Sequence, residues 1–345
     1  MNTAAFQSAS AVASSWRGRY DRLRLNSSRP FSKLPGAAYP RGTGMFPSRD
    51  DVVDYLERYA RDNDIEIRFR THVERLDADE GGWLVTTGSG EIRAPEVVVA
   101  TGYEHTFFVP RWPGRDSFEG RLIHSAEYEN PDSFVGQDVL VAGSGSSGME
   151  IAYDLVRGGA RRVRVAVRTP PNIILRDPLG PFFARLIVKL PAARADRFMS
   201  FLRRKQIGDL SELGLPEPAE GVVSRLKRLG VTPAIVDGEM LDAIRDRRIE
   251  IVAAVESVDG ALVELADGDR IAPDAIIAAT GYRRGLEPLV GHLGVLDQDG
   301  HPVVHGATTH PRAPGLHFIG FSEPLSGNMR QLRLDSRRIA RAAAR

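Results

Sequence analysis

The stretch QDVLVAGSGSSGMEIAYDLVRGGARRVRVAVRT, residues 137–169, contains the strongest structural signal in the chain. An apolar run at 139–142 is followed by six small residues, a helical segment at 149–156 and a second apolar run at 163–167. This order of strand, turn, helix and strand is typical of the phosphate-binding unit of a parallel sheet. It predicts an α/β protein that contains a Rossmann-like unit.

The turn in this unit has the glycine spacing of a pyrophosphate-binding loop. The first glycine permits the tight turn, the second lets the backbone approach the phosphates, and the third lets the helix pack on the strand. The start of the helix adds free amides and a partial positive charge. In this context the spacing favours dinucleotide binding over an ordinary glycine-rich turn, and the residues expected to contact the ligand are Gly143, Ser144, Gly145, Ser146, Ser147 and Gly148.

The residues after the second strand indicate which dinucleotide binds. Enzymes that prefer NAD usually carry an acidic residue there, which hydrogen-bonds the ribose hydroxyls. Here the strand is followed by Arg168 and Thr169, and an arginine can pair with the ribose phosphate of NADP. The alternative is a solvated arginine among several others on the same strand. We expect NADPH to be preferred over NADH.

Composition narrows the function classes further. The 345 residues suffice for about two domains, and a net charge of +1 gives no sign of a nucleic-acid partner. The absence of cysteine excludes disulfides and thiol chemistry and fits a cytoplasmic location. No apolar run is long enough for a membrane span, so we expect no stable membrane insertion.

Elements outside the central unit suggest one domain inserted into another. Ser48 caps an amphipathic helix whose apolar residues Val52, Val53, Leu56, Tyr59 and Ala60 share a face, and a second helix begins at about Asn328. Residues 65–87 and 249–271 alternate as strands do. Two β-branched runs, at 97–100 and 275–279, read as fully buried parallel strands.

Both of these runs end in Ala-Thr-Gly, at Thr101-Gly102 and Thr280-Gly281. The repeat predicts an outer domain of residues 1–133 and 275–345 around an inner domain of residues 134–274. Residues 171–245 form a mostly helical insertion in the inner domain. The ligand edge of such sheets lies at the carboxyl ends of the strands, where these triplets stand.

A second motif carries a resemblance to a known family. Phe118, Gly120, His124 and Tyr128 have the spacing F-x-G-x-x-x-H-x-x-x-Y, which resembles the identifying pattern of flavin-containing monooxygenases. Taken alone, the histidine reads as a core or linker residue. The segments VVVATGY, GSGSSGMEIAYDL and IIAATGYR are similar to family segments in family order, and residues 232–252 resemble the plant indole-3-pyruvate monooxygenase branch.

The resemblance implies two nested, glutathione-reductase-like nucleotide domains, the outer binding FAD and the inner NADPH. It implies that NADPH reduces the flavin, that the reduced flavin forms a peroxide adduct with dioxygen, and that a soft nucleophile or a 2-oxo acid is oxygenated. Asn26 matches an asparagine beside the cofactors and is the candidate catalytic residue; a loop-capping asparagine is the alternative. Trp16, Arg22 and Leu25 would line the flavin side.

The family's first strand and its FAD-binding GxGxxG turn have no counterpart ahead of Trp16. The outer domain is therefore expected to lack its first strand and helix. A start codon placed too far downstream, a truncated gene and a protein that dropped its flavin are the three explanations, and we favour the first.

Other functions stay open beside the monooxygenase. One is a flavin-free NADPH-binding module with a sensing role, and another is an NADPH oxidase or flavin reductase. The amphipathic segment at 181–204 suits a membrane surface or, as we prefer, a cover over the substrate entrance. His301 and His305 have metal-like spacing, but we expect no metal. The expected partners are a small-molecule substrate and dioxygen, with a homodimer left open.

Overall fold

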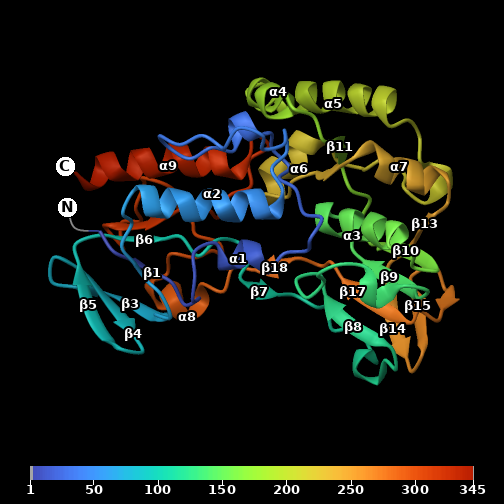
Figure 1. Cartoon of the computed structure of the whole chain (residues 1–345), viewed down its shortest axis with the longest axis horizontal. Helices are drawn as coiled ribbons and strands as arrows, with labels where there is room; N and C mark the ends of the chain where they lie inside the picture. Colours follow the sequence, from blue (N-terminus) through green and yellow to red (C-terminus); the bar gives the residue numbers. More distant parts are fainter. Residues whose placement is uncertain (1–2, 345) are drawn as a thin grey trace. The chain divides into compact units, whose positions relative to one another are not determined.

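The computed structural model describes residues 3–344, and they divide into two compact units (Figure 1). One unit, called the inner unit here, comprises residues 18–27 and 108–281. The other, the outer unit, comprises residues 28–107 and the described residues up to 17 and from 282 onward. These limits differ from the predicted domain limits, because residues 108–133 and 275–281 belong with the inner sheet. The assignment of the two units to NADPH and FAD stays a prediction.

The inner unit is built on a five-stranded parallel sheet in the order β13-β10-β9-β17-β8. Its strands are β8 (Arg121–His124), β9 (Asp138–Ala142), β10 (Arg162–Val167), β13 (Ile249–Ala253) and β17 (Ala275–Ala278). All five residues of β9 are buried, because the strand has neighbours on both sides and apolar clusters on both faces. This strand carries the glycine turn at its carboxyl end.

The predicted strand-turn-helix-strand unit is confirmed. Helix α3 (Ser146–Arg157) follows β9, starts three residues earlier than expected and buries Met149, Ile151 and Leu155. Strand β10 pairs with β9 in parallel register, with Ala166 opposite Ala142. The carboxyl ends of these two strands therefore lie at the same edge of the sheet, which brings the glycine turn beside Arg168.

The two strands that end in Ala-Thr-Gly differ in burial. All of β17 is buried between β9 and β8, as expected for a central parallel strand. The expectation of full burial is wrong for β6 (Val97–Val99), since Val98 is 45% exposed. Within the described residues β6 pairs only with β19 (Leu316–Phe318), in parallel register. The two apolar runs are similar in sequence, but β17 has a strand on each side and β6 has one paired strand in the described part of the chain, so their burial differs.

In the outer unit, helix α2 (Arg49–Asp62) begins at the predicted cap. Ser48 and Asp51 form a reciprocal capping box, which satisfies two amides at the helix start. The buried face includes Tyr55, which the predicted apolar stripe had missed, while Leu56 and Tyr59 are only partly buried. Tyr55 is buried because its ring stacks on Tyr39 at 4.0 Å.

Two antiparallel meanders lie largely within the stretches predicted as strands, although β13 at the start of the second stretch belongs to the parallel sheet. The first joins β3 (Val73–Asp79), β4 (Gly82–Thr87) and β5 (Gly90–Ala94), and the second joins β14 (Val255–Asp259), β15 (Leu262–Leu265) and β16 (Arg270–Ile271). The C-terminal helix is α9 (Asn328–Ala343).

The remaining elements are short or belong to the helical insertion. In the outer unit they are β1 (Ala5–Phe6), α1 (Ser14–Arg17), β2 (Ile67–Arg68), β7 (Thr106–Phe107), β18 (Tyr282–Arg283) and α8 (Glu287–Val290). The insertion contains β11 (Ile173–Leu175), α4 (Gly180–Ile187), α5 (Ala192–Gln206), α6 (Val222–Leu229), β12 (Ala234–Val236) and α7 (Gly238–Arg245). Single 3-10 turns stand at η1 (Arg29–Phe31), η2 (Arg115–Ser117), η3 (Asp132–Phe134), η4 (Ser211–Leu213) and η5 (Gly291–Leu293).

Candidate functional site

The three glycines of the turn have two different surroundings. Gly143 has a φ of +123°, and a Cβ there would collide with the carbonyl oxygen of Ala279. A Cβ at Gly148 would collide with the carbonyl oxygen of Gly143. A Cβ at Gly145, in contrast, would meet no atom within 4 Å. The outer two glycines fit the backbone against itself, whereas Gly145 borders open space.

The amides at the start of α3 face the same opening. The helix has no side-chain cap, and its first backbone bond runs from Met149 N to Gly145 O at 3.0 Å. Among residues 3–344, the amides of Ser146, Ser147 and Gly148 find no acceptor. Exposed amides at a helix start bind anions, so the arrangement fits the pyrophosphate of a dinucleotide.

Arg168 differs from the other arginines of the same strand. Arg162 pairs with Glu250 at 2.8 Å, and Arg164 pairs with Asp138 at 2.5 Å. Just before the strand, Arg161 pairs with Asp274 at 3.0 Å. Arg168 is exposed beyond the end of β10, next to exposed Thr169, and has no ion pair to the described part of the chain. Its guanidinium is therefore available to a ligand phosphate.

The glycine of the second motif, Gly120, has a local structural role. The Phe118 ring and the Asp274 carbonyl oxygen lie so close to Gly120 that any Cβ would collide with both. The absence of a side chain at Gly120 lets β8 begin close to its neighbour β17. There Arg121 N donates a hydrogen bond to Asp274 O at 3.1 Å. These two residues set the register of β8 at the sheet edge.

His124 stands at the carboxyl end of β8 and fixes the end of β17. Its Nδ1 accepts a hydrogen bond from Ala126 N at 3.1 Å, so the other ring nitrogen carries the proton. Nε2 then donates to Gly281 O, also at 3.1 Å. Burial lowers the pKa of His124, which keeps the ring neutral. The histidine is a fixed donor beneath the second Ala-Thr-Gly turn.

Tyr128 connects the motif to the nucleotide-binding helix. Its hydroxyl donates to Asp154 Oδ2 at 2.8 Å, and Asp154 lies on α3 two turns after the glycine turn. Burial raises the pKa of both side chains, with the nearby carboxylate adding to the effect on the tyrosine. The motif thus joins the sheet edge, the end of β17 and helix α3 within the inner unit.

A buried polar cluster beneath the same helix was missed at the sequence level. Arg176, whose side chain is 3% exposed, pairs with Glu150 of α3 and with Asp237 at 2.8 Å. Glu150 also accepts from the hydroxyl of Tyr20. Burial raises the pKa of Glu150, and Arg176 opposes that shift. The only sequence signal was an acidic pair, Glu150 and Asp154, four residues apart on an otherwise apolar helix.

This cluster also reaches the candidate catalytic residue. Asn26 is exposed, and its Oδ1 accepts from Arg176 Nη2 at 3.1 Å. Nearby, the Arg22 guanidinium stacks on the ring of Tyr153 at 4.6 Å, and Leu25 is buried. The structure therefore brings Asn26 and Arg22 to α3, the helix that carries the predicted NADPH turn.

The other predicted cofactor residues lie at loop positions. Trp16 is half-buried in α1 of the outer unit. Thr101 is exposed after β6, and a Cβ at Gly102 would meet no atom within 4 Å, so their contact with FAD stays a prediction. In the inner unit Thr280 donates to Phe108 O, and Gly281 has a φ of +84°.

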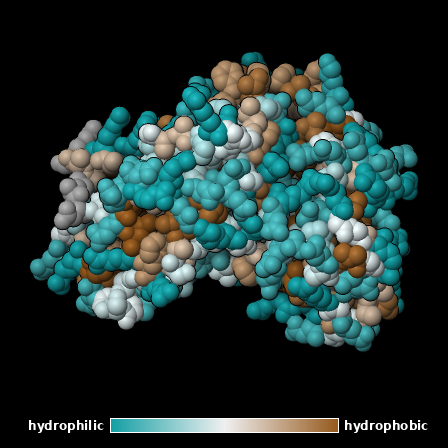
Figure 2. Space-filling view, in the orientation of Figure 1, coloured by the Kyte–Doolittle hydropathy of each residue, from teal (hydrophilic) through white to brown (hydrophobic). Residues whose placement is uncertain are grey.

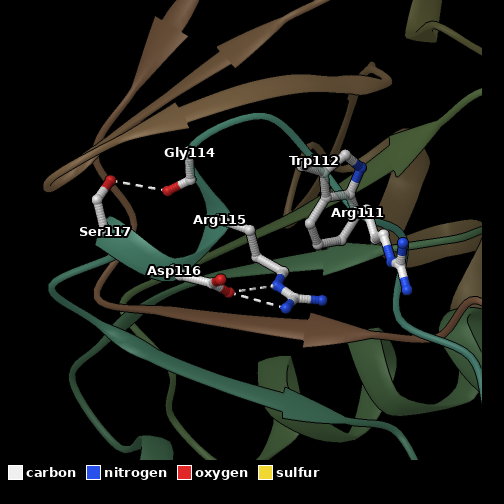
Figure 3. A pocket seen from close by; sticks show the side chains of 6 residues that line it. All are labelled: Arg111, Trp112, Gly114, Arg115, Asp116 and Ser117. Carbon is white, nitrogen blue, oxygen red and sulfur yellow. Dashed lines mark hydrogen bonds and ion pairs between the residues drawn. The ribbon is translucent and has the colours of Figure 1, made fainter.

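A cavity of about 300 Å³ in the inner unit is lined by none of the predicted site residues (Figure 3). Its walls are Arg111, Trp112, Gly114, Arg115, Asp116 and Ser117. Arg115 is neutralised there by Asp116 at 2.8 Å, and Ser117 donates to Gly114 O. No residue predicted to bind a cofactor or substrate lines this cavity, so we assign it no part in the site.

No group of three or more His, Cys, Asp or Glu side chains within residues 3–344 is arranged to hold a metal ion. None of the helices in that range is both long enough and apolar enough to cross a membrane.

The chain is similar to known oxidoreductases in sequence. The profile of the pyridine nucleotide-disulphide oxidoreductase family matches residues 38–176. The chain is 34% identical over 322 residues to an indole-3-pyruvate monooxygenase, YUCCA1, of Oryza sativa subsp. japonica, covering 91% of this chain and 79% of the relative. It is 33% identical over 323 residues to a probable indole-3-pyruvate monooxygenase, YUCCA9, of Arabidopsis thaliana, covering 90% and 76%.

Solved structures show the same fold at lower identity. A flavin-containing monooxygenase from Stenotrophomonas maltophilia matches with a TM-score of 0.68 and 22% identity, over 95% of this chain and 88% of the other. A cyclohexanone monooxygenase from Rhodococcus sp. Phi1 bound to NADP+ matches with a TM-score of 0.69 and 18% identity, over 98% and 79%. The predicted fold class, two nested Rossmann-like domains, is confirmed.

Proposed function

The chain belongs to the flavin-containing monooxygenase family, and we propose that it oxygenates a small organic substrate with NADPH and dioxygen. The enzyme class, a flavin-dependent oxidoreductase, and the cofactors FAD and NADPH are those of the family. The observation that carries the proposal is the 34% identity over 91% of the chain, together with an anion-binding turn that is intact. When bound, FAD and NADPH supply hydride transfer and the activation of dioxygen.

The chain's own residues bind and orient the nicotinamide nucleotide. The amides of Ser146, Ser147 and Gly148 would hold the pyrophosphate, with Gly145 leaving room for its approach. Arg168, just after β10, would pair with the ribose phosphate. Arg162 and Arg164 of the strand are paired with carboxylates, whereas Arg168 has no ion pair within the described residues. Such a charge-assisted contact is specific to NADPH over NADH.

The motif at 118–128 and Arg176 act as positioning groups. His124 holds the end of β17 through Gly281, and Tyr128 holds α3 through Asp154. Arg176 orients the Asn26 amide and ties it to Glu150 of the same helix. Asn26 is then placed to offer its amide hydrogens to a bound cofactor, while its oxygen is already engaged.

For the substrate we propose a small molecule with a soft nucleophile or a 2-oxo acid group, and the 2-oxo acid is favoured. The relatives at 33–34% identity carry the name of an enzyme that acts on indole-3-pyruvate, a 2-oxo acid. Oxygenation of such an acid would release carbon dioxide and leave the shorter carboxylic acid. The second oxygen atom of dioxygen leaves as water, with the two electrons coming from NADPH.

The test measures three quantities on the purified full chain. Absorbance in the flavin bands reports bound FAD, and NADPH consumption is compared with the carboxylic acid formed from indole-3-pyruvate and with hydrogen peroxide released. We expect a flavin spectrum and nearly one acid per NADPH. Peroxide in place of acid would identify an NADPH oxidase, and a colourless protein that cannot be loaded with FAD would contradict the proposal.

A further inference from the structure

Helices α4 and α5 of the insertion expose an unusual row of apolar side chains (Figure 2). In α4 and its flanks the exposed residues recur at spacings of three and four, which places them on one side of the helix. Each is between 44% and 61% exposed, and so are two phenylalanines of α5. We call the set the apolar row: Leu179, Phe182, Phe183, Leu186, Leu190, Phe198 and Phe201.

The opposite sides of the two helices face the protein. Ile187 of α4 and Ala195 of α5 pack with Val223 of α6 in a small core cluster, to which Ala192 and Met199 add. The inward residues of α4 and α5 in this cluster are therefore two alanines, an isoleucine and a methionine, while the phenylalanines and several leucines are exposed. A helix that only covered the protein would show the reverse pattern.

Cations outnumber anions along the apolar row, although Arg204 near its end is paired with Glu217 at 3.0 Å. Residues 179–206 contain seven basic residues and one acidic residue, although the whole chain is nearly neutral at +1. The one acid, Asp196, accepts hydrogen bonds from the amides of Val223 and Ser224 at the start of α6. The exposed cations are Arg185, Lys189, Arg194, Arg197, Arg204 and Lys205.

We propose that this face binds the surface of an anionic lipid membrane, lying on it without crossing it. Apolar side chains would enter the boundary between headgroups and acyl chains, and the flanking cations would meet the lipid phosphates. A second copy of the chain fits the face less well, because symmetric contact would bring Arg194 and Arg197 of both copies together without counter-ions. The charge pattern thus selects an anionic partner.

The test is sedimentation of the purified full chain with vesicles. One set contains phosphatidylcholine and phosphatidylglycerol in equal parts, and the other contains phosphatidylcholine alone. We expect the protein to bind the anionic vesicles. Binding to the neutral vesicles, and binding to the anionic vesicles in high salt, should each be at least tenfold weaker.

Two double variants and a control separate the contributions. Phe183→Ser with Phe201→Ser removes apolar contact, and Arg194→Gln with Arg197→Gln removes charge; each is expected to weaken binding about tenfold or more. The control, Leu229→Ser with Leu262→Ser, changes two residues of the same unit that are 46% and 42% exposed and is expected to bind normally. Circular dichroism and thermal melting confirm that all the variants fold.

Three outcomes would overturn the proposal. The first is the absence of vesicle binding by the folded protein, and the second is equal binding to neutral and anionic vesicles. The third is a concentration-dependent dimer in ultracentrifugation that Phe183→Ser with Phe201→Ser abolishes while vesicle binding is absent, which would assign the face to a second copy. None of these measurements depends on turnover, so the proposed oxygenation can fail or hold independently.

Discussion

Gly145 and Gly148 belong to one turn but answer to different constraints. Gly148 lies against the carbonyl oxygen of Gly143, whereas Gly145 borders open space and has an ordinary extended φ of −73°. We therefore expect Gly148 to matter for the stability of the fold and Gly145 for the binding of the ligand.

Alanine at these two positions is expected to separate the roles. Gly145→Ala should leave thermal stability unchanged and weaken NADPH binding roughly tenfold or more, because its methyl group occupies the approach to the pyrophosphate. Gly148→Ala should lower the free energy of unfolding by about 1–3 kcal/mol, because a backbone carbonyl must move. Melting curves and calorimetry with NADPH give both quantities. A Gly145→Ala protein that binds NADPH as tightly as the parent would remove the turn from the site.

Arg168 is tested by its effect on cofactor preference. Arg168→Ala should weaken NADPH binding roughly tenfold or more, the size of a lost hydrogen bond to a charged group, and leave NADH binding unchanged. Arg161→Ala is the matched control, since that guanidinium is already paired with Asp274. Kinetics with both nucleotides measure the ratio. Equal losses for NADPH and NADH would show that the arginine does not contact the ribose phosphate.

His124 is expected to make the stability of the fold depend on pH. Burial lowers its pKa below the value of about 6.5 that it has in the unfolded chain, so the unfolded state takes up a proton first as the pH falls. Its contribution to stability is present above that value and is lost as the pH falls towards the folded pKa. His305 is shifted in the same direction by burial, so the wild type is compared with His124→Gln. The variant should lose less stability between pH 7 and pH 5, as chemical denaturation would show; identical losses would exclude His124 as a source.

At the scale of elements, α3 is where the site is assembled. Its first turn offers amides, Glu150 meets Arg176 and Tyr20, and Asp154 meets Tyr128. The helix is held in register by side chains that come from distant parts of the inner unit.

Tyr128→Phe should show how firmly the motif holds this helix. The change leaves Asp154 buried without that donor, which should cost about 1–3 kcal/mol in the free energy of unfolding. In the double variant with Asp154→Ala, which removes the acceptor, the loss should be smaller than the sum, because the two side chains share one hydrogen bond. Denaturant titrations give the four values of the cycle. Strictly additive losses would mean that the bond contributes nothing.

At the scale of the whole molecule, the features that the sequence predicted correctly are those that depend on residues close together in the chain. The unit at 137–169 was predictable because its strands, turn and helix depend on neighbouring residues, and the Ser48 cap for the same reason. The exposure of Val98 was not predictable, since burial depends on which strands lie beside the residue. The contact of Arg176 with Asn26 joins residues 150 positions apart, and no periodicity encodes it.

The central claim is that the chain transfers one atom of dioxygen to a substrate, and an isotope experiment tests it most directly. The full chain is supplied with NADPH and indole-3-pyruvate under 18O-labelled dioxygen, and the acid formed is analysed by mass spectrometry. Catalase is present throughout, because hydrogen peroxide alone converts a 2-oxo acid to the shorter acid. We expect one labelled oxygen atom in each molecule of product and the other in water. Acid without label, or NADPH consumed without formation of labelled acid, would contradict the claim.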